Sequence, residues 1–114
     1  KYKVSAGAVL VWAQIQHMVE VLDHHRLPAW EMISIGSDFD GTINPPEGCY
    51  SSMDYSNLGL DLLKLAGNYL LGRRGTWNFP ENGLVDPGTI LHKFSSGNAI
   101  AFLDRYFRTY KSLP

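Results

Sequence analysis

Apolar residues recur at intervals of three and four along residues 8–25, and this spacing predicts one helix with a single apolar face. The stripe consists of Ala8, Val11, Trp12, Ile15, Met18, Val19 and Leu22. The polar residues that fall mostly on the other side are Gln14, Gln16, Glu20 and Asp23. Pro28 cannot continue the hydrogen-bond ladder and disfavours helical geometry in the residue before it, so this helix should end near His25.

The second half of the chain predicts another helix of this kind. It should run from about Tyr55 to Ala66, because Gly67-Asn68 is a stop signal. Its apolar set is Leu58, Leu62, Leu63 and Leu65. Between residues 67 and 85 few positions are periodic, and the residue types of Pro80-Glu81-Asn82-Gly83 are typical of a turn.

The C-terminal part of the chain predicts a short helix and then a final amphipathic one. Asp86 followed by Pro87 is typical of an N-cap and first helical position, and the short helix should end at Gly97. Asn98 should cap the last helix. The stripe of that helix is Ala99, Phe102, Leu103, Tyr106, Phe107 and Tyr110.

Residues 31–35 have a different pattern, since Ile33-Ser34-Ile35 is a short apolar, β-branched run that Gly36 stops. Such a run predicts a buried strand of a parallel sheet. A loop rich in Gly, Pro, Asn and Asp follows over residues 36–54 and opens with two acids, Asp38 and Asp40. In α/β barrels the catalytic residues sit at the carboxyl ends of the strands, so the two acids indicate a catalytic site.

Composition narrows the possible functions. The 114 residues have the size of one domain, with 45% hydrophobic residues and a formal net charge of -1. The 10 basic residues are scattered, which argues against a nucleic-acid-binding surface. The longest apolar stretch, residues 6–13, falls far short of the roughly 18 to 20 residues that a membrane span requires.

The single cysteine, Cys49, excludes an internal disulfide and gives no indication of the compartment. It has no histidine at a motif spacing, and we interpret it as a half-buried loop thiol. The chain begins at Lys1 with neither a methionine nor a signal-like apolar core, so we expect its natural start to lie upstream.

The run Gly36-Ser37-Asp38-Phe39-Asp40-Gly41, followed by Pro45-Pro46-Glu47-Gly48, resembles the C-terminal portion of the membrane dipeptidase (renal dipeptidase) family of metal-dependent amidohydrolases. Gly97-Asn98-Ala99-Ile100-Ala101-Phe102 is similar to the opening of that family's final helix, so two motifs occur in the family's order. The resemblance covers residues 33–48 and 97–107 and extends to the helix at 8–25. It does not extend to residues 68–90, where the chain is longer than the family pattern.

The resemblance implies an α/β fold, with residues 1–114 as a single segment from the C-terminal portion of a TIM-barrel (β/α)8 metallohydrolase. As an isolated chain it should be mostly helical with one short strand. A barrel needs about 250 residues, so this chain would supply about one of the eight strands. The parent enzyme would hydrolyse dipeptides or related amide bonds with two zinc ions. The family's metal ligands lie upstream of the matched region, so the chain alone should be inactive.

The resemblance gives a catalytic role to Asp38. In the family the first acid after the last strand lies beside the metal-bound water, where it accepts the water's proton and contacts the substrate's amine. Asp40 is a candidate for substrate binding. Both acids have a structural alternative, because Asp in such a loop can cap a turn through its own backbone. Asp40 can also support the site without touching the substrate, or shape the loop for Gly41. Glu47 is either part of the pocket rim or a solvated loop acid.

The four histidines do not form a metal motif. His24 and His25 are adjacent, and neighbours on a helix point about 100° apart, whereas two ligands on one face need a spacing of four. Their place near a helix C-terminus favours imidazolium, so we interpret them as solvated terminal residues. His17 lies toward the polar edge of the helix, and we interpret it as a structural residue.

The stripes at residues 8–22 and 102–110, together with a strand edge at 31–35, predict self-association. An exposed strand edge pairs readily, and a large apolar patch is rare on a stable monomer, so a homodimer is the expected state. The alternative function left open is a non-catalytic helical module that dimerises through the same apolar surface.

Overall fold

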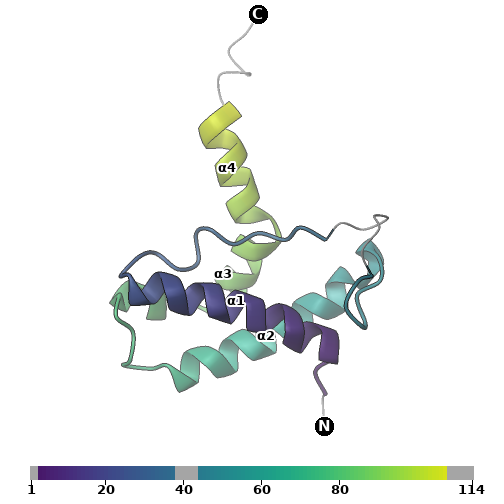
Figure 1. Ribbon diagram of the computed structural model, residues 1–114, viewed down its shortest axis with the longest axis horizontal. Helices are drawn as coiled ribbons and strands as arrows, with labels where there is room; N and C mark the ends of the chain where they lie inside the picture. Colours follow the sequence, from purple (N-terminus) through teal and green to yellow (C-terminus); the bar gives the residue numbers. More distant parts are fainter. Residues whose placement is uncertain (1–2, 38–43, 108–114) are drawn as a thin grey trace, which may run out of the picture.

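Helices make up all of the regular secondary structure in the computed structural model, which describes residues 3–37 and 44–107 (Figure 1). In chain order they are α1 (Ala6–His24), η1 (Ser52–Asp54), α2 (Tyr55–Gly72), η2 (Pro80–Gly83), α3 (Pro87–His92), η3 (Lys93–Gly97) and α4 (Asn98–Phe107). The short elements η1 and η2 are 3-10 turns, and η3 is a π turn. The predicted fold class is therefore wrong, because the described residues contain no sheet and do not form an α/β segment of a TIM barrel.

The expected strand at residues 31–35 is an extended segment without a strand partner. Within the described part of the chain, residues 31–36 take part in no backbone–backbone hydrogen bond. Ile33 is buried and Ile35 half-buried while Ser34 is exposed, so successive side chains alternate as they do in a strand. A sheet also requires a neighbouring strand about 4.8 Å away, which a local pattern does not supply.

The first helix is confirmed by α1, and both of its ends are capped. Ser5 accepts a hydrogen bond from the N–H of Ala8 at 3.2 Å, as an N-cap does. At the other end Arg26 adopts a left-handed conformation with φ 57°, and the N–H of Leu27 donates to the carbonyl of Leu22 at 3.0 Å. This is a Schellman motif, so the chain turns away through its own capping before Pro28 is reached.

The predicted stop at Gly67-Asn68 is wrong, because α2 continues to Gly72. The added turn carries Tyr69, whose ring packs edge-on against Trp12 at 5.7 Å and against Trp77 at 5.8 Å between centroids. A glycine inside a helix costs only about 1 kcal/mol, which such packing exceeds.

The elements α3, η3 and α4 form one helical run. The predicted N-cap at Asp86 is confirmed, since its carboxylate accepts from the N–H of Thr89 at 2.9 Å. Gly97 does not end the run, and Asn98 has helical backbone angles of φ -67° and ψ -40°. The predictions of a stop at Gly97 and a cap at Asn98 are therefore wrong. The π turn carries the chain from one helix into the next.

The core lies between α1, α2 and α3. The helix α1 runs alongside α2, and the extended segment passes back over α1 near the base of α4 (Figure 1). The buried apolar residues are Ala8, Trp12, Ile15, Val19, Ala29, Trp30, Ile33, Cys49, Leu58, Leu62, Ala66, Ile90 and Phe94. Trp12 and Trp30 are both buried and stack at 6.5 Å between ring centroids. No helix among the described residues has the length and apolar character needed to cross a membrane.

Candidate functional site

Asp38 and Asp40 lie outside the described residues. The candidate site is therefore defined by the two segments that flank them, residues 31–37 and 44–51. The first segment approaches along α1, and the second returns to the N-terminal end of the same helix (Figure 1). Contacts with the helices fix both of these flanking segments in place.

The upstream flank is tied to the start of α4 by Asn98. The buried side chain of this residue donates two hydrogen bonds of 2.8 Å from Nδ2, one to the carbonyl of Trp30 and one to the carbonyl of Ile33. A further hydrogen bond and ion pair joins Lys93 Nζ to Glu31 Oε1. The residues that follow α3 thus hold the segment that leads to Asp38.

An open cleft of about 260 Å³ separates this segment from α1. The residues that line it are Val11, Gln14, Ile15, Met18, Ile33, Ser34, Ile35, Gly36, Ser37, Pro46, Leu58 and Phe94. A smaller apolar cavity of about 120 Å³ lies beside Ile35, with Tyr55 and Phe94 among its walls. The flanking segment therefore rests on helices through Ile33 and Ile35, and the cleft opens next to the residues that precede Asp38.

The downstream flank is held at the N-terminal end of α1. Gly7 packs so closely on this flank that a methyl group in its place would overlap the carbonyl oxygen of Glu47. Gly48 has φ 83°, a conformation that glycine adopts without the penalty of a side chain. Glu47 itself is exposed, as expected for a solvated loop acid. A close backbone contact thus fixes the point to which the loop returns.

Cys49 is buried rather than half-buried, and its N–H donates to the carbonyl of Pro46 at 3.1 Å. Burial raises the pKa of its thiol, and the nearby charge of Asp54 raises it further. A thiol of raised pKa carries little thiolate at neutral pH, so Cys49 is poorly suited to act as a nucleophile.

The histidines are all exposed. His24 is the last residue of α1 and His25 its C-cap, so the interpretation of both as solvated terminal residues is confirmed. Their rings meet edge-on at 5.3 Å between centroids. Among the described residues, no group of three or more His, Cys, Asp or Glu side chains is placed to hold a metal ion.

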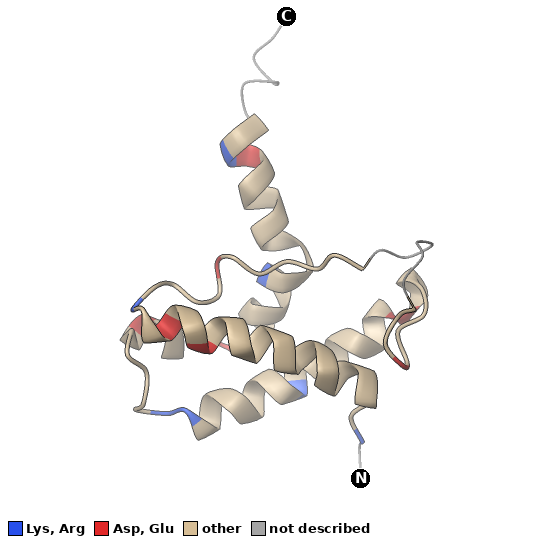
Figure 2. Cartoon of the chain, in the orientation of Figure 1, with Lys and Arg blue, Asp and Glu red and all other residues tan. Residues whose placement is uncertain are grey.

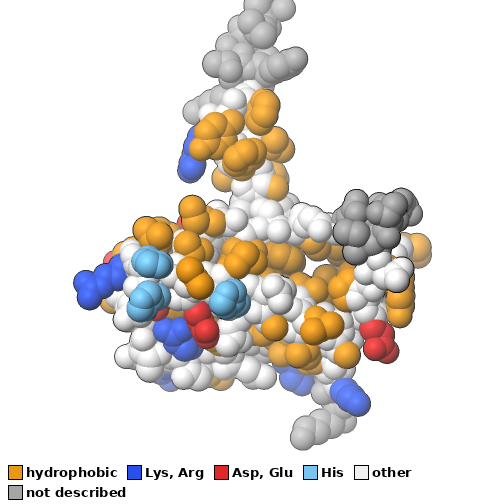
Figure 3. Space-filling view, in the orientation of Figure 1, with side chains coloured by type: hydrophobic (Ala, Val, Ile, Leu, Met, Phe, Trp, Pro, Cys, Tyr) orange, Lys and Arg blue, Asp and Glu red, His pale blue; other side chains and the backbone are white. Residues whose placement is uncertain are grey.

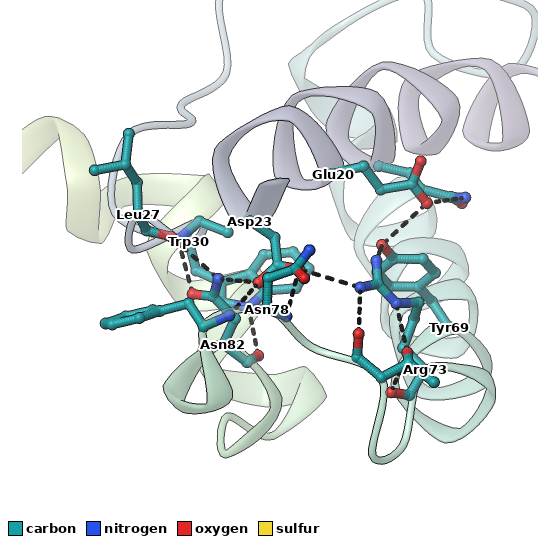
Figure 4. A network of polar contacts seen from close by, with 12 residues as sticks. Glu20, Asp23, Leu27, Trp30, Tyr69, Arg73, Asn78 and Asn82 are labelled. Atoms are coloured by element: carbon teal, nitrogen blue, oxygen red, sulfur yellow. Dashed lines mark hydrogen bonds and ion pairs between the residues drawn. The ribbon is translucent and has the colours of Figure 1, made fainter. Parts of the chain in front are cut away.

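The sequence interpretation missed a highly connected polar residue, Asp23, which is only 1% exposed (Figure 4). Oδ1 accepts from the N–H of Phe79 at 3.0 Å and from Asn82 Nδ2 at 2.9 Å. Oδ2 accepts from Arg73 Nη2 at 3.1 Å and from the N–H of Asn78 at 3.0 Å. Asp23 was placed on the polar side of the helix, but it lies four residues after the buried Val19. A carboxylate four residues after a buried apolar residue lies on the same face of the helix, and this spacing is the sequence signal that identifies Asp23.

The partners of Asp23 are themselves held in place. Arg73 also donates to the hydroxyl of Tyr69 at 3.1 Å, and its guanidinium lies 4.3 Å from the ring centroid of Trp77. Asn82 accepts from the N–H of Ala29 at 2.9 Å and donates to the carbonyl of Leu27 at 3.1 Å. The network therefore joins the end of α1 to the end of α2 and to the 78–82 segment.

Burial alone would raise the pKa of Asp23, but the hydrogen bonds from Phe79, Asn78, Asn82 and Arg73 outweigh it and lower the pKa to about 2. At neutral pH this carboxylate is ionised, and its lone pairs are occupied by these donors. It is therefore unsuited to exchange protons with a substrate, and the network is structural.

No protein-family model, curated protein or solved structure matches this chain. The resemblance to the membrane dipeptidase family thus depends on the two motifs alone.

Proposed function

We propose that this chain is the C-terminal part of a metal-dependent dipeptidase or related amidohydrolase, to which it contributes the loop with Asp38 and Asp40. The observation that supports the proposal is the pair of 2.8 Å hydrogen bonds from Asn98 to Trp30 and Ile33. Asn98 belongs to one of the two motifs that resemble the family, and Ile33 belongs to the segment that leads into the other. The second motif therefore contacts the segment that leads into the first, although the two are far apart in the sequence.

In this proposal Asp38 accepts the proton of the attacking water and contacts the amine of the substrate, and Asp40 contributes to substrate binding. Zinc would be held by ligands from outside this chain, because the metal ligands of the family that it resembles lie upstream of the matched region. The role of the chain's own helices is to fix the two ends of the loop, through Asn98 at Ile33 and through Gly7 at Glu47.

The experiment is an assay of the longer polypeptide, loaded with zinc, against a panel of dipeptides. Asp38→Asn should lower the turnover number by about two to four orders of magnitude, the usual loss when a general base is removed. The matched control is Glu81→Gln, which neutralises an exposed acid outside both matched motifs and should change turnover by less than about threefold. A polypeptide without zinc-dependent hydrolysis, or an Asp38→Asn variant as active as the control, would contradict the proposal.

The chain by itself should retain no zinc after dialysis, because a catalytic site needs about three converging protein ligands for each metal. Metal analysis of the purified chain tests this expectation. Stoichiometric zinc bound through His24 and His25, or through Asp38 and Asp40, would show that the chain carries its own metal site.

A second candidate function is the non-catalytic helical interaction module, and the helix α4 favours it. The large apolar side chains of this helix are exposed, which is typical of a protein–protein contact surface. A chain that self-associates, while the longer polypeptide hydrolyses no dipeptide, would favour this candidate over the first.

A further inference from the structure

The helix α4 extends away from the helical body and carries an uncovered apolar face (Figures 1 and 3). We define this face, the α4 face, by its large apolar side chains, which are Ile100, Phe102, Leu103, Tyr106 and Phe107. Each is between 54% and 60% exposed. Their spacing of three and four residues places them on one side of the helix.

The α4 face needs a cover for the helix to be stable. Its 10 residues are the end of a helical run whose earlier part, α3, packs on α2, and most helical stability in proteins comes from packing an amphipathic face against a partner. Its main packing partner is η3, the turn from which it emerges. Within the helix, the rings of Phe102 and Tyr106 contact each other at 4.8 Å between centroids, and this leaves their outer sides in solvent.

The area of the α4 face suits a pair of identical copies. A large apolar side chain that is about half exposed leaves roughly 100 Å² to be covered, so five leave on the order of 500 Å² on each chain. Two such faces bury about 1,000 Å² together, which is the lower limit for a specific interface. We propose that the α4 face is a self-association surface, on which a second copy of this chain packs its own α4 in antiparallel orientation about a two-fold axis.

The charges of α4 are compatible with this arrangement. The only charged residues of the helix, Asp104 and Arg105, lie near its far end (Figure 2). By helical spacing both fall outside the α4 face, so a two-fold contact buries no like charges. An antiparallel pair also places opposite helix ends side by side, which is favourable for their dipoles. The near-neutral formal charge of -1 adds little repulsion between copies.

Analytical ultracentrifugation of the chain over a range of micromolar concentrations tests the proposal. The wild-type chain should reach twice 12.8 kDa at the upper concentrations. Leu103→Glu places a charge at the centre of the α4 face and should raise the dissociation constant at least tenfold. Ala101→Glu is the matched control, since it adds the same charge on the opposite side of the same helix, and it should leave the constant within about threefold.

Cysteine cross-linking provides a second test that keeps the surface uncharged. The two-fold axis passes near the middle of the α4 face, so Leu103→Cys should form a disulfide between copies at least tenfold faster than Ala101→Cys. The native Cys49 is buried and leaves the introduced thiol as the reactive one. A wild-type chain that stays monomeric, equal effects of the two glutamate variants, or equal cross-linking rates would each overturn the proposal.

Discussion

Two buried asparagines hold the segment between α1 and the loop of Asp38, and their surroundings differ. Asn82 lies in a closed network, where it binds the backbone of Ala29 and Leu27 and the carboxylate of Asp23. Asn98 binds the carbonyls of Trp30 and Ile33 on the other side of the segment. Around Ile33, residues 31–36 have no backbone–backbone hydrogen bond within the described residues.

The two regions therefore differ in how much of their surface the rest of the molecule already covers. Around Asp23 the polar groups pair with one another, and the guanidinium of Arg73 also lies over the rings of Tyr69 and Trp77. At Asn98, an extended backbone and the α4 face lie near each other and are both accessible (Figure 1). Both proposals, the loop of Asp38 and the self-association of α4, concern this second region.

The largest expected effect is that of Asp23→Asn. An amide cannot accept hydrogen bonds on both atoms, and the change leaves Arg73 without its carboxylate, so the free energy of unfolding should fall by about 3–5 kcal/mol. Urea unfolding at neutral pH measures it. The control is Glu81→Gln, an exposed acid on η2, which should cost less than about 0.5 kcal/mol. A loss below about 1 kcal/mol for Asp23→Asn would mean that the network does not support the fold.

The same carboxylate should make stability depend on acid pH. Its folded pKa is lowered from 3.8 to about 2, so its contribution is complete above about pH 4 and is lost as the pH falls toward 2. The shift corresponds to about 2–3 kcal/mol. The measurement is the difference in unfolding free energy between the wild type and Asp23→Asn from pH 6 to pH 2. That difference should shrink over this range, and a constant difference would contradict the lowered pKa.

On the other side of the segment, Asn98→Ala should have a smaller and more local effect. Two carbonyls lose their donor, which costs about 1–2 kcal/mol. Because the segment is then released from α4, a protease specific for glutamate should cleave at Glu31 about tenfold faster. Asn68→Ala, on the exposed side of α2, is the control and should change neither quantity. Unaltered cleavage at Glu31 would show that Asn98 does not restrain the segment.

The smallest expected effect is a gain in stability from Arg26→Gly. Arg26 has φ 57°, a left-handed conformation that costs a side chain about 1–2 kcal/mol, and glycine recovers part of this. The variant should be about 0.5–1 kcal/mol more stable by urea unfolding. Arg74→Gly replaces an exposed arginine without a positive φ and should give no gain. Equal responses of the two variants would show that the turn at Arg26 is unstrained.

Periodicity was sufficient to predict that α1, α2 and α4 are helices, because apolar residues at intervals of three and four specify the element. It did not give the end of α2 or the whole buried face of α1, where Met18 of the stripe is exposed and Asp23 is buried. It was not sufficient for the segment at 31–35, since whether an extended run becomes a strand depends on a neighbour that its own residues do not encode. Asn98 illustrates the same limit. Its residue type favours a helix cap. Instead, its side-chain amide is buried and donates hydrogen bonds to the carbonyls of Trp30 and Ile33.

Within the candidate site, Asp38 and Asp40 are known from the sequence motif, and they stay predictions because they lie outside the described residues. The network of Asp23 was missed because its partners come from the ends of α1 and α2 and from the 78–82 segment. These residues meet only after the helices have packed. The phase of Asp23 within its stripe was the one local sign.

The π turn η3 has a consequence for the direction in which α4 points. A π turn contains one residue more than an α-helical turn, and each residue rotates a helix by about 100°. The extra residue therefore lets α3 direct Ile90 into the core while α4 begins in a different rotational phase, with Asn98 turned toward Ile33. A regular α-helix of the same residues would rotate the α4 face by about a quarter of a turn, whereas deleting Ser96 would remove the extra residue and keep that face near its present direction. One residue thus acts as an angular adjustment between the core and the exposed surface.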